Sequence, residues 1–359
     1  MNSLFHHVVE LYEKKDYENL KDIYLSIDKN NEKIIYTIIE ILLDFKEGNI
    51  DRYISNLELL LNYINAENKK EILPFYHLRK HLYYIFVQEY ESAMDELGRA
   101  VCAVGKYGDI NILPKIYIQQ IELAAFYMRD FAVAEKLLDK YQSAMSDTIL
   151  MNTYFNTIKA YIYSYENNNK SLEYVKIIEK NMSSLKKDEY FEEIIIRYAY
   201  ALINLGLYDK LDNLLEKIDE ESPEKYLIKS FYSYGNKNYL KAFNVFSECF
   251  EKYYDKKKYD EFWLKIFIIA AESQNHLGNL ELAEEFFNKM LDQFDYFYSK
   301  IKHENYRKVF VNIYRPYLIN TFLFFRNLGK TEVLKNLIEK YEHVFEVIEN
   351  LEEDSQNLR

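Results

Sequence analysis

Segments of the chain repeat one arrangement of apolar and polar residues, and residues 276–291, HLGNLELAEEFFNKML, show it most regularly. Beyond the glycine, Ala283 and Phe287 recur at the spacing of one face of an α-helix. Gly278 suits the left-handed backbone that ends a helix, and Asn279 suits the N-cap that starts the next one. The small Ala283 allows two helices to approach closely, while the larger side chains fill the groove between them. This stretch therefore predicts a helix–turn–helix hairpin with a tight turn.

The same pattern occurs in eight further segments, which differ mainly in the residue that stands at the turn. These segments begin at Lys14, Glu47, Gln88, Met128, Asn167, Leu205, Asn236 and Leu328. The equivalent turn positions, in chain order, are residues 15, 48, 88, 129, 167, 206, 237, 278 and 329. Successive positions lie 31 to 51 residues apart, most of them near 40. The chain therefore predicts about nine helical hairpins in series.

Glycine and proline support this register independently. Four of the eight glycines occupy the turn position. All four prolines fall where the first helix of a hairpin is expected to start, and proline is tolerated there because that N–H has no partner within the helix. They are Pro74, Pro114, Pro223 and Pro316. So few glycines and prolines in 359 residues also argue against an all-β fold, which needs many turns. We therefore predict an all-α chain.

Two segments differ from this pattern. Residues 251–261, EKYYDKKKYDE, are expected to form a charged connector between two hairpins. The final residues, 349–359, are polar and are expected to form a frayed tail.

The pattern G-N-x-x-x-A-x-x-x-F, in which x is any residue, resembles the tetratricopeptide repeat (TPR), whose period is about 34 residues. The best matches carry Ala134, Ala242 and Ala283 at the small position. The other hairpins are degenerate, with larger residues there that include Tyr53, Leu172, Leu211 and Leu334. The resemblance implies a right-handed α-solenoid of about nine repeats, continuous over residues 1–348. It also implies that the first helix of each hairpin lines a concave wall.

Charge and cysteine usage limit the classes of partner. The net charge of −12 is unfavourable for binding nucleic acid, which usually requires a basic surface. Cys102 and Cys249 lie far apart and outside any CxxC motif, so we expect each to act as a small buried apolar residue in a reducing compartment. The N-terminal residues do not resemble a signal peptide, and no apolar run is long enough for a membrane helix. We expect a cytoplasmic protein.

No catalytic or cofactor motif stands out. His77 and His81 have the i, i+4 spacing of a zinc-binding helix, but the sequence HLRKH lacks the glutamate that such hydrolases use as a base. Packing or surface roles are the stronger interpretation of both histidines. Residues 97–111 show a rhythm slightly like a DNA-binding helix-turn-helix, and we favour the end of a second helix followed by a loop. We expect a protein that is not an enzyme and binds no cofactor or metal.

The register also predicts which residues face the groove of the solenoid. These positions fall about two, three, six and ten residues before each turn, and some neighbours reach the rim. Aromatic rings and amides suit an extended peptide, because amides pair with backbone N–H and C=O groups and tyrosines offer apolar faces with a polar tip. The alternative is that the tyrosines only pack helices. The predicted peptide-binding residues are Gln119, Tyr127, Thr157, Tyr161, Tyr165, Arg197, Tyr200, Asn204, Tyr234, Glu272, Asn275, His276, Asn320 and Arg326.

We interpret the chain as a regulator that binds a short peptide or protein segment and acts through a protein effector. It is similar to the peptide-pheromone-sensing TPR regulators of low-GC Gram-positive bacteria and their phages, in which TPR superhelices take part in quorum sensing. One alternative is a constitutive scaffold or chaperone-like adaptor for a larger protein, and a peptide-responsive transcription regulator ranks lower. The aromatic residues 294–298 offer one contact through which two copies would form a homodimer.

Overall fold

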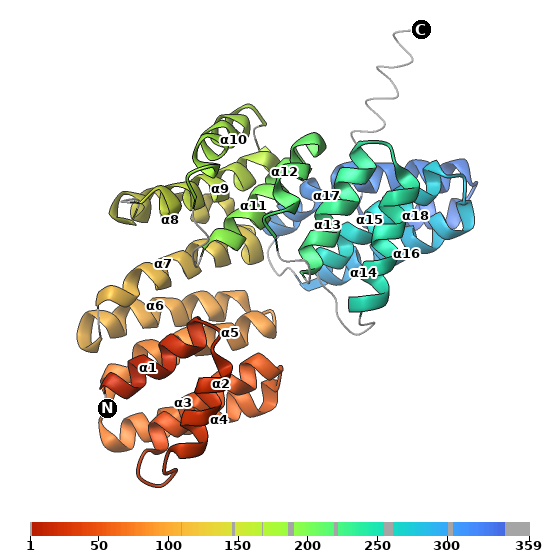
Figure 1. The fold of residues 1–359 in the computed structure, drawn as a ribbon. Coiled ribbons are helices and arrows are strands. Elements are labelled where there is room, and N and C mark those ends of the chain that lie inside the picture. The colour runs from red at the N-terminus through yellow and green to blue at the C-terminus, as the bar shows by residue number, and fades with distance from the viewer. Residues whose placement is uncertain are drawn as a thin grey trace. The chain divides into compact units, whose positions relative to one another are not determined.

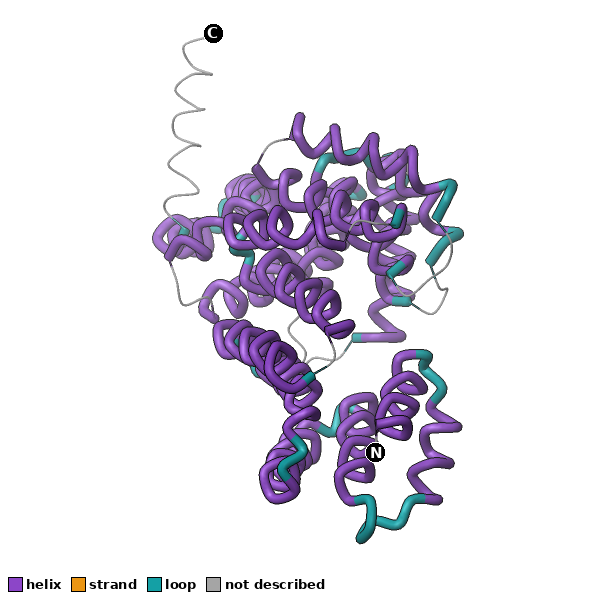
Figure 2. Tube along the Cα trace, turned by 90° about the vertical axis from the view of Figure 1, so that its left-hand side faces the viewer, coloured by secondary structure: helices purple, strands orange, loops and turns teal. Residues whose placement is uncertain are grey.

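The computed structural model describes residues 2–108, 110–145, 148–166, 168–185, 190–218, 222–254, 261–300 and 304–341. Within these ranges every regular element is helical and no strand occurs, which confirms the prediction of an all-α chain. Figure 2 shows these helices joined by short loops. None of the helices in the described part is long and apolar enough to cross a membrane.

The α-helices differ mainly in length. They are α1 (Asn2–Glu13), α2 (Tyr17–Ser26), α3 (Lys33–Glu47), α4 (Ile50–Glu67), α5 (Leu73–Phe86), α6 (Tyr90–Tyr107), α7 (Leu113–Glu122), α8 (Phe131–Met145), α9 (Ile149–Glu166), α10 (Asn168–Met182), α11 (Phe191–Asn204), α12 (Asp212–Leu215), α13 (Pro223–Gly235), α14 (Tyr239–Tyr253), α15 (Glu261–His276), α16 (Leu280–Lys300), α17 (Glu304–Asn327) and α18 (Thr331–Lys340). Three short 3₁₀ segments and one π-helical segment accompany them. They are η1 (Lys70–Ile72), η2 (Ile110–Ile112), η4 (Tyr208–Leu211) and the π-helical η3 (Leu123–Met128).

The chain forms two compact units, Met1–Leu137 and Leu138–Arg359, with the boundary inside α8. Within each unit, helices that flank a turn pack against each other, and Figure 1 shows these pairs side by side. In the first unit the pairs are α1 with α2, α3 with α4, and α5 with α6. In the second unit they are α9 with α10, α13 with α14, α15 with α16, and α17 with α18. First helices of successive hairpins also touch, as α1 does with α3, α9 with α11, and α13 with α15.

The backbone is left-handed at eight of the nine predicted turn positions. The φ angle is 68° to 78° at the four glycines, and it is 54° to 61° at the four positions where another residue stands. The eight positions are Lys15, Gly48, Gln88, Arg129, Gly206, Lys237, Gly278 and Gly329. The ninth, Asn167, lies outside the described residues. The predicted turns are therefore confirmed wherever the structure describes them.

Hydrogen bonds explain why these turns end one helix and start the next. At Gly278, the N–H of the glycine donates to Asn275 O (3.1 Å), and the next N–H donates to Gln274 O (2.9 Å). This pattern satisfies carbonyls that the end of a helix leaves without partners. Asn279 then precedes α16 and accepts from the N–H of Ala283 with its carbonyl (3.0 Å), as a residue at the N-cap position does. Its side chain, however, donates to the side chain of Gln274 (2.6 Å).

The alanines at the small position of the repeats are closely packed, as predicted. Ala134, Ala242 and Ala283 are completely buried. Phe287, one turn after Ala283, is 1% exposed, and its ring centroid lies 4.7 Å from that of Phe324 on α17. Burying one such side chain contributes about 1.5–3 kcal/mol. Apolar packing between neighbouring hairpins therefore contributes to stability.

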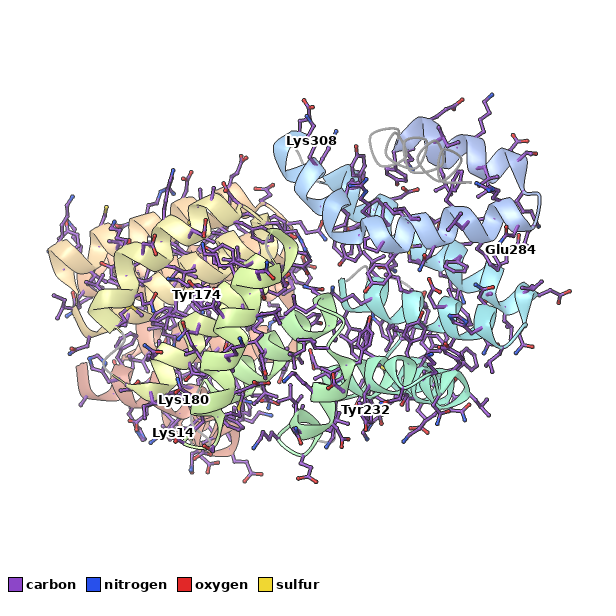
Figure 3. The ribbon with its side chains drawn as sticks, turned by 90° about the horizontal axis from the view of Figure 1, so that it is seen from above. Lys14, Tyr174, Lys180, Tyr232, Glu284 and Lys308 are labelled. Atoms are coloured by element: carbon purple, nitrogen blue, oxygen red, sulfur yellow. The ribbon has the colours of Figure 1, made fainter. Side chains whose placement is uncertain are left out.

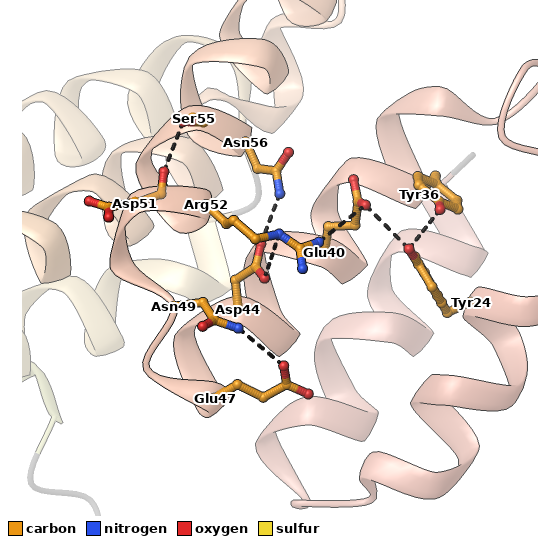
Figure 4. A network of polar contacts seen from close by, with 10 residues as sticks. All are labelled: Tyr24, Tyr36, Glu40, Asp44, Glu47, Asn49, Asp51, Arg52, Ser55 and Asn56. Atoms are coloured by element: carbon orange, nitrogen blue, oxygen red, sulfur yellow. Dashed lines mark hydrogen bonds and ion pairs between the residues drawn. The ribbon is translucent and has the colours of Figure 1, made fainter.

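A polar network adds specific contacts within the first unit (Figure 4). The hydroxyl of Tyr24 on α2 lies 2.6 Å from that of Tyr36 on α3 and donates to Glu40 Oε1 (3.2 Å). Burial and the bond to Tyr36 raise the pKa of Tyr24. Arg52 on α4 pairs with Glu40 (3.9 Å) and with Asp44 (3.5 Å). The network thus joins three helices across two loops.

Several other ion pairs lie on the surface and contribute little. Lys308 pairs with Glu304 one turn away (2.8 Å), and Figure 3 shows Lys308 pointing away from the helices. Glu284 on α16 pairs with Lys330, which follows the turn after α17 (2.8 Å).

Two sequence-based expectations need correction. Pro74, Pro114 and Pro223 do start helices, but Pro316 lies in the interior of α17, because this helix begins at Glu304 and is longer than the repeat pattern predicted. Cys249 is buried as expected, whereas Cys102 on α6 is exposed.

Two expectations on the connections between helices have different outcomes. Residues 97–107 form the end of α6, which confirms the helical part of the preferred interpretation, while residues 110–112 form the 3₁₀ segment η2 where a loop was expected. Of the predicted connector, residues 251–253 still belong to α14, and residues 255–260 lie outside the described residues, as does the tail, 349–359.

Candidate functional site

The predicted groove residues are divided between the two units. Gln119 and Tyr127 belong to the first unit, and the other twelve belong to the second. The amide Oε1 of Gln119 lies 2.9 Å from His81 Nε2, so it is already engaged with α5. Tyr127 is 42% exposed, and its ring lies 5.9 Å from that of Tyr90. A single groove that includes all fourteen residues remains a prediction.

On α9 the predicted residues mostly pack. Thr157 is fully buried and donates to the carbonyl of Thr153 (2.8 Å) in its own helix. Tyr161 is 3% exposed, and Tyr165 stands edge-on to it with ring centroids 5.1 Å apart. Asn204 at the end of α11 donates to Ser164 Oγ (3.0 Å) and so joins α11 to α9. These side chains serve helix packing in this structure.

A buried lysine lies between two tyrosines farther along the second unit. Lys265 on α15 is 1% exposed. Its Nζ lies 5.4 Å from the ring centroid of Tyr200 on α11 and 5.3 Å from that of Tyr314 on α17. Both distances are within the range of cation–π attraction. Tyr200 is thus the predicted residue that the structure places against this cation.

Two turns along the same helix, Glu272 is a buried carboxylate with 5% exposure. Asn320 on α17 donates its Nδ2 to Glu272 Oε1 (2.9 Å). Burial raises the pKa of the Glu272 carboxyl above its usual 4.5, and the bond from Asn320 and the proximity of His276 oppose this rise. Two predicted residues, 48 positions apart, are therefore in direct contact.

Tyrosines and one histidine surround this carboxylate. Burial and the charge of Glu272 together raise the pKa of Tyr208 in η4 and of Tyr234 on α13. The pKa of Tyr317 on α17 is raised by burial first and then by these neighbours, Glu272 included. The ring of Tyr234 lies 6.4 Å from that of Tyr208 and 6.1 Å from that of His276. We call Tyr208, Tyr234, Glu272, His276, Tyr317 and Asn320 the Glu272 site.

The Glu272 site is open at its rim. His276 and Asn320 are exposed, and the three tyrosines are half-buried. The imidazole of His276 stacks on the ring of Tyr239, with centroids 4.2 Å apart and the planes 9° from parallel. The site therefore combines a buried carboxylate with exposed polar side chains at its edge.

The remaining predicted residues lie around these contacts. Asn275 is half-buried, and Arg326 is exposed at the end of α17. The backbone carbonyl of each residue accepts a hydrogen bond from the glycine N–H of the turn that follows. Arg197 on α11 is half-buried and takes part in further interactions.

Sequence reasoning missed Tyr208, Lys265, Tyr314 and Tyr317. The predicted positions stopped ten residues before each turn, whereas α15 and α17 continue farther. Extending the helical stripe by one turn would have reached Lys265. Tyr208 follows its turn and belongs to no first helix, so the rule could not include it.

The histidine pair of α5 is engaged in packing contacts. His77 Nδ1 lies 2.6 Å from Glu96 Oε2 on α6, while His81 Nε2 faces Gln119. Burial lowers the pKa of His81 to about 4, which keeps it neutral near pH 7. In the described part of the chain, no three His, Cys, Asp or Glu side chains are placed to hold a metal ion.

The predicted contact between copies is mostly occupied within the chain. Phe294 is fully buried, and its ring packs against those of Phe310, Tyr314 and Tyr341. This residue is therefore not available for a homodimer, although its neighbours Tyr296 to Tyr298 are half-buried.

Comparison of the chain with models of protein families and with curated proteins found no match.

Proposed function

We propose that the chain is a right-handed, TPR-like α-solenoid that binds a short peptide or an extended protein segment along its first helices. The recurrence of left-handed turns at the predicted positions supports this architecture. Contacts between the first helices of successive hairpins, such as α9 with α11 and α13 with α15, support it as well. Stacked hairpins of this kind bury together the apolar faces that no single hairpin could bury alone.

The observation that carries the proposed function is the composition of the Glu272 site. Its groups come from three first helices, α13, α15 and α17, and from η4. An exposed amide, an imidazole and half-buried tyrosine rings converge on one buried carboxylate. Amides recognise a peptide backbone, tyrosine rings bind apolar side chains, and the carboxylate selects charge.

In this proposal the output is a protein–protein interaction. The ligand would bind one conformation of the solenoid more tightly than others and so shift the population toward it. Because Glu272 and Asn320 join α15 to α17, a ligand at this site would change how these hairpins pack. A protein effector would read that change, as in the peptide-pheromone regulators that the repeats resemble.

Affinity selection from a random pool of hexapeptides, read by mass spectrometry, tests the proposal. The wild type should enrich a restricted set of sequences, and the variants Tyr234→Ala and Asn320→Ala should lose most of that enrichment. Tyr226→Ala is the matched control, because Tyr226 is a half-buried tyrosine of the same helix that packs against Tyr253 outside the site. A wild type that enriches no peptide would refute the proposal and favour a constitutive scaffold for a larger protein.

A further inference from the structure

Two of the buried carboxylates, Glu96 and Glu272, have opposite surroundings. Glu96 on α6 is 2% exposed and faces three basic side chains. His77 lies 2.6 Å away, Arg99 2.8 Å and Lys80 3.3 Å. Glu272 is 5% exposed, yet none of the basic side chains that the structure describes forms an ion pair with it. A buried carboxylate is costly unless a cation compensates it, so this difference requires an explanation.

The hydrogen-bond acceptors at Glu272 are only partly used. Oε1 accepts from Asn320, while Oε2 has no donor among the residues of the described ranges. Asn320 uses its Nδ2 for this bond, so its Oδ1 also remains an acceptor. The hydroxyls of the surrounding tyrosines add further acceptors. The site thus presents several acceptors and one negative charge, with exposed Asn320 and His276 at its rim.

These acceptors match an ammonium group. An ammonium carries three N–H donors on one atom, and it can bond to a carboxylate oxygen, an amide oxygen and a hydroxyl at once. Tyrosine faces attract the same cation. A guanidinium prefers both oxygens of one carboxylate, and here one of them is already bonded to Asn320. A calcium ion takes about six to eight oxygen ligands, more than one carboxylate and one amide supply.

We propose that Glu272 binds an ammonium group of the peptide ligand, either its α-amino group or a lysine side chain. This inference rests on the proposed peptide-binding function and specifies the chemistry that the site selects. The ligand cation would supply the compensating charge that Glu96 receives from its own chain. His276 is the ionisable side chain that faces Glu272 from the same helix, and it lies at the rim, stacked on Tyr239.

The test uses the hexapeptide pool in four forms, with a free or an acetylated amino terminus and with lysine present or omitted. The wild type, Glu272→Gln and Glu96→Gln are compared in parallel. Glutamine keeps the shape of Glu272 and can still accept the bond from Asn320, but it removes the negative charge and replaces one carboxylate oxygen by an N–H donor. We expect the wild type to enrich peptides from the forms that carry an ammonium, and Glu272→Gln to bind the enriched peptides about tenfold more weakly or worse. Glu96→Gln should retain them.

If acetylation abolishes enrichment, the bound group is the α-amino group. If omission of lysine abolishes it, the bound group is a lysine side chain. If Glu272→Gln enriched the same peptides equally, or if the pool with neither group were enriched as well, the assignment of Glu272 would be wrong while peptide binding stood. If no form were enriched by the wild type, both this inference and the proposed function would fail. The thermal stability of Glu272→Gln, measured in the same samples, excludes unfolding as the cause of lost binding.

Discussion

Replacing Glu96 or Glu272 by glutamine should change the stability of the protein in opposite directions. Both side chains are almost completely buried, and both substitutions remove one negative charge while keeping the shape of the side chain. Glu96 loses three basic partners at 2.6 to 3.3 Å, whereas Glu272 keeps its one bond, from Asn320. The first substitution therefore breaks a compensated charge cluster, and the second removes a charge that forms no ion pair with the residues the structure describes.

The expected magnitudes follow from these contacts. Arg99 is 61% exposed and contributes little, while Lys80 and His77 are 23% and 16% exposed and would be left without their acceptor. Loss of a hydrogen bond to a charged group costs about 1.5–3 kcal/mol. Because the amide oxygen of glutamine can keep some of these bonds, Glu96→Gln should lower the free energy of unfolding by roughly 2–4 kcal/mol. Glu272→Gln should gain about 0.5–2 kcal/mol, the range of a typical stabilising substitution. Each kcal/mol shifts the Tm of a domain of this size by about 2–4 °C.

The two effects also differ in their dependence on pH. Burial alone would raise the pKa of Glu96, but His77 and Lys80 hold it below its usual 4.5, so its contribution is lost as pH falls through the lowered value. Burial raises the pKa of Glu272 above 4.5, so its neutral form favours the folded state at low pH, and this contribution is lost as pH rises through the raised value. The advantage of Glu272→Gln should therefore appear on going from below pH 4.5 toward neutral pH.

Calorimetric melts of the wild type and both variants between pH 4 and 8 measure these differences. A fall in Tm for Glu96→Gln together with a rise for Glu272→Gln at neutral pH is the expected result. A clear fall in Tm for Glu272→Gln at pH 7 would show that the charge is compensated within the protein. The reasoning that leads from this residue to a cationic ligand would then be refuted.

Three further substitutions and one chemical treatment test the fold. Gly278→Ala should destabilise the protein by about 1–2 kcal/mol in urea unfolding, because residue 278 has a left-handed φ of 78°. Lys237→Gly should stabilise the protein, because residue 237 is also left-handed. Equal effects of the two substitutions would contradict this explanation. Pro316→Ala should restore a hydrogen bond inside α17 and raise stability by about 1–3 kcal/mol in the same assay, and a loss would mean that the helix requires the proline there. Exposed Cys102 should react with a thiol reagent in the folded protein. Cys249 should react only on unfolding, because it is fully buried and burial raises the pKa of its thiol to about 12. Fast reaction of both thiols would contradict the packing of α14.

The turns could be predicted from the sequence because their signals are local. A glycine such as Gly278 and a small residue five positions later are both visible without knowledge of any distant contact. Asn167 is the only turn position for which the structure gives no result. Pro316 was misplaced because the length of α17 depends on packing against other helices, which the period of the repeat does not specify.

The candidate site was predictable only in part. Glu272 and Tyr234 were found because they lie on the expected face of a first helix, and Asn320 was included as a neighbour that reaches the rim. That Glu272 bonds to Asn320, 48 residues away, depends on how α15 and α17 meet. Burial of Lys265 and exposure of Cys102 are likewise tertiary properties, since charge and polarity alone indicate the opposite for both. Local pattern thus gave the positions, and packing between helices gave the partners.

The residues at the left-handed turns have a consequence for the order of folding. A turn at Gly48, Gly206, Gly278 or Gly329 forms without backbone strain, while the turns at Lys15, Gln88, Arg129 and Lys237 cost about 1–2 kcal/mol each. That cost would slow the formation of an isolated hairpin by roughly 5–30-fold if the turn forms in the transition state. We therefore expect the glycine hairpins to act as folding nuclei and the others to form against them. Kinetic φ values near one at Gly278 and near zero at Lys237 would reveal this order.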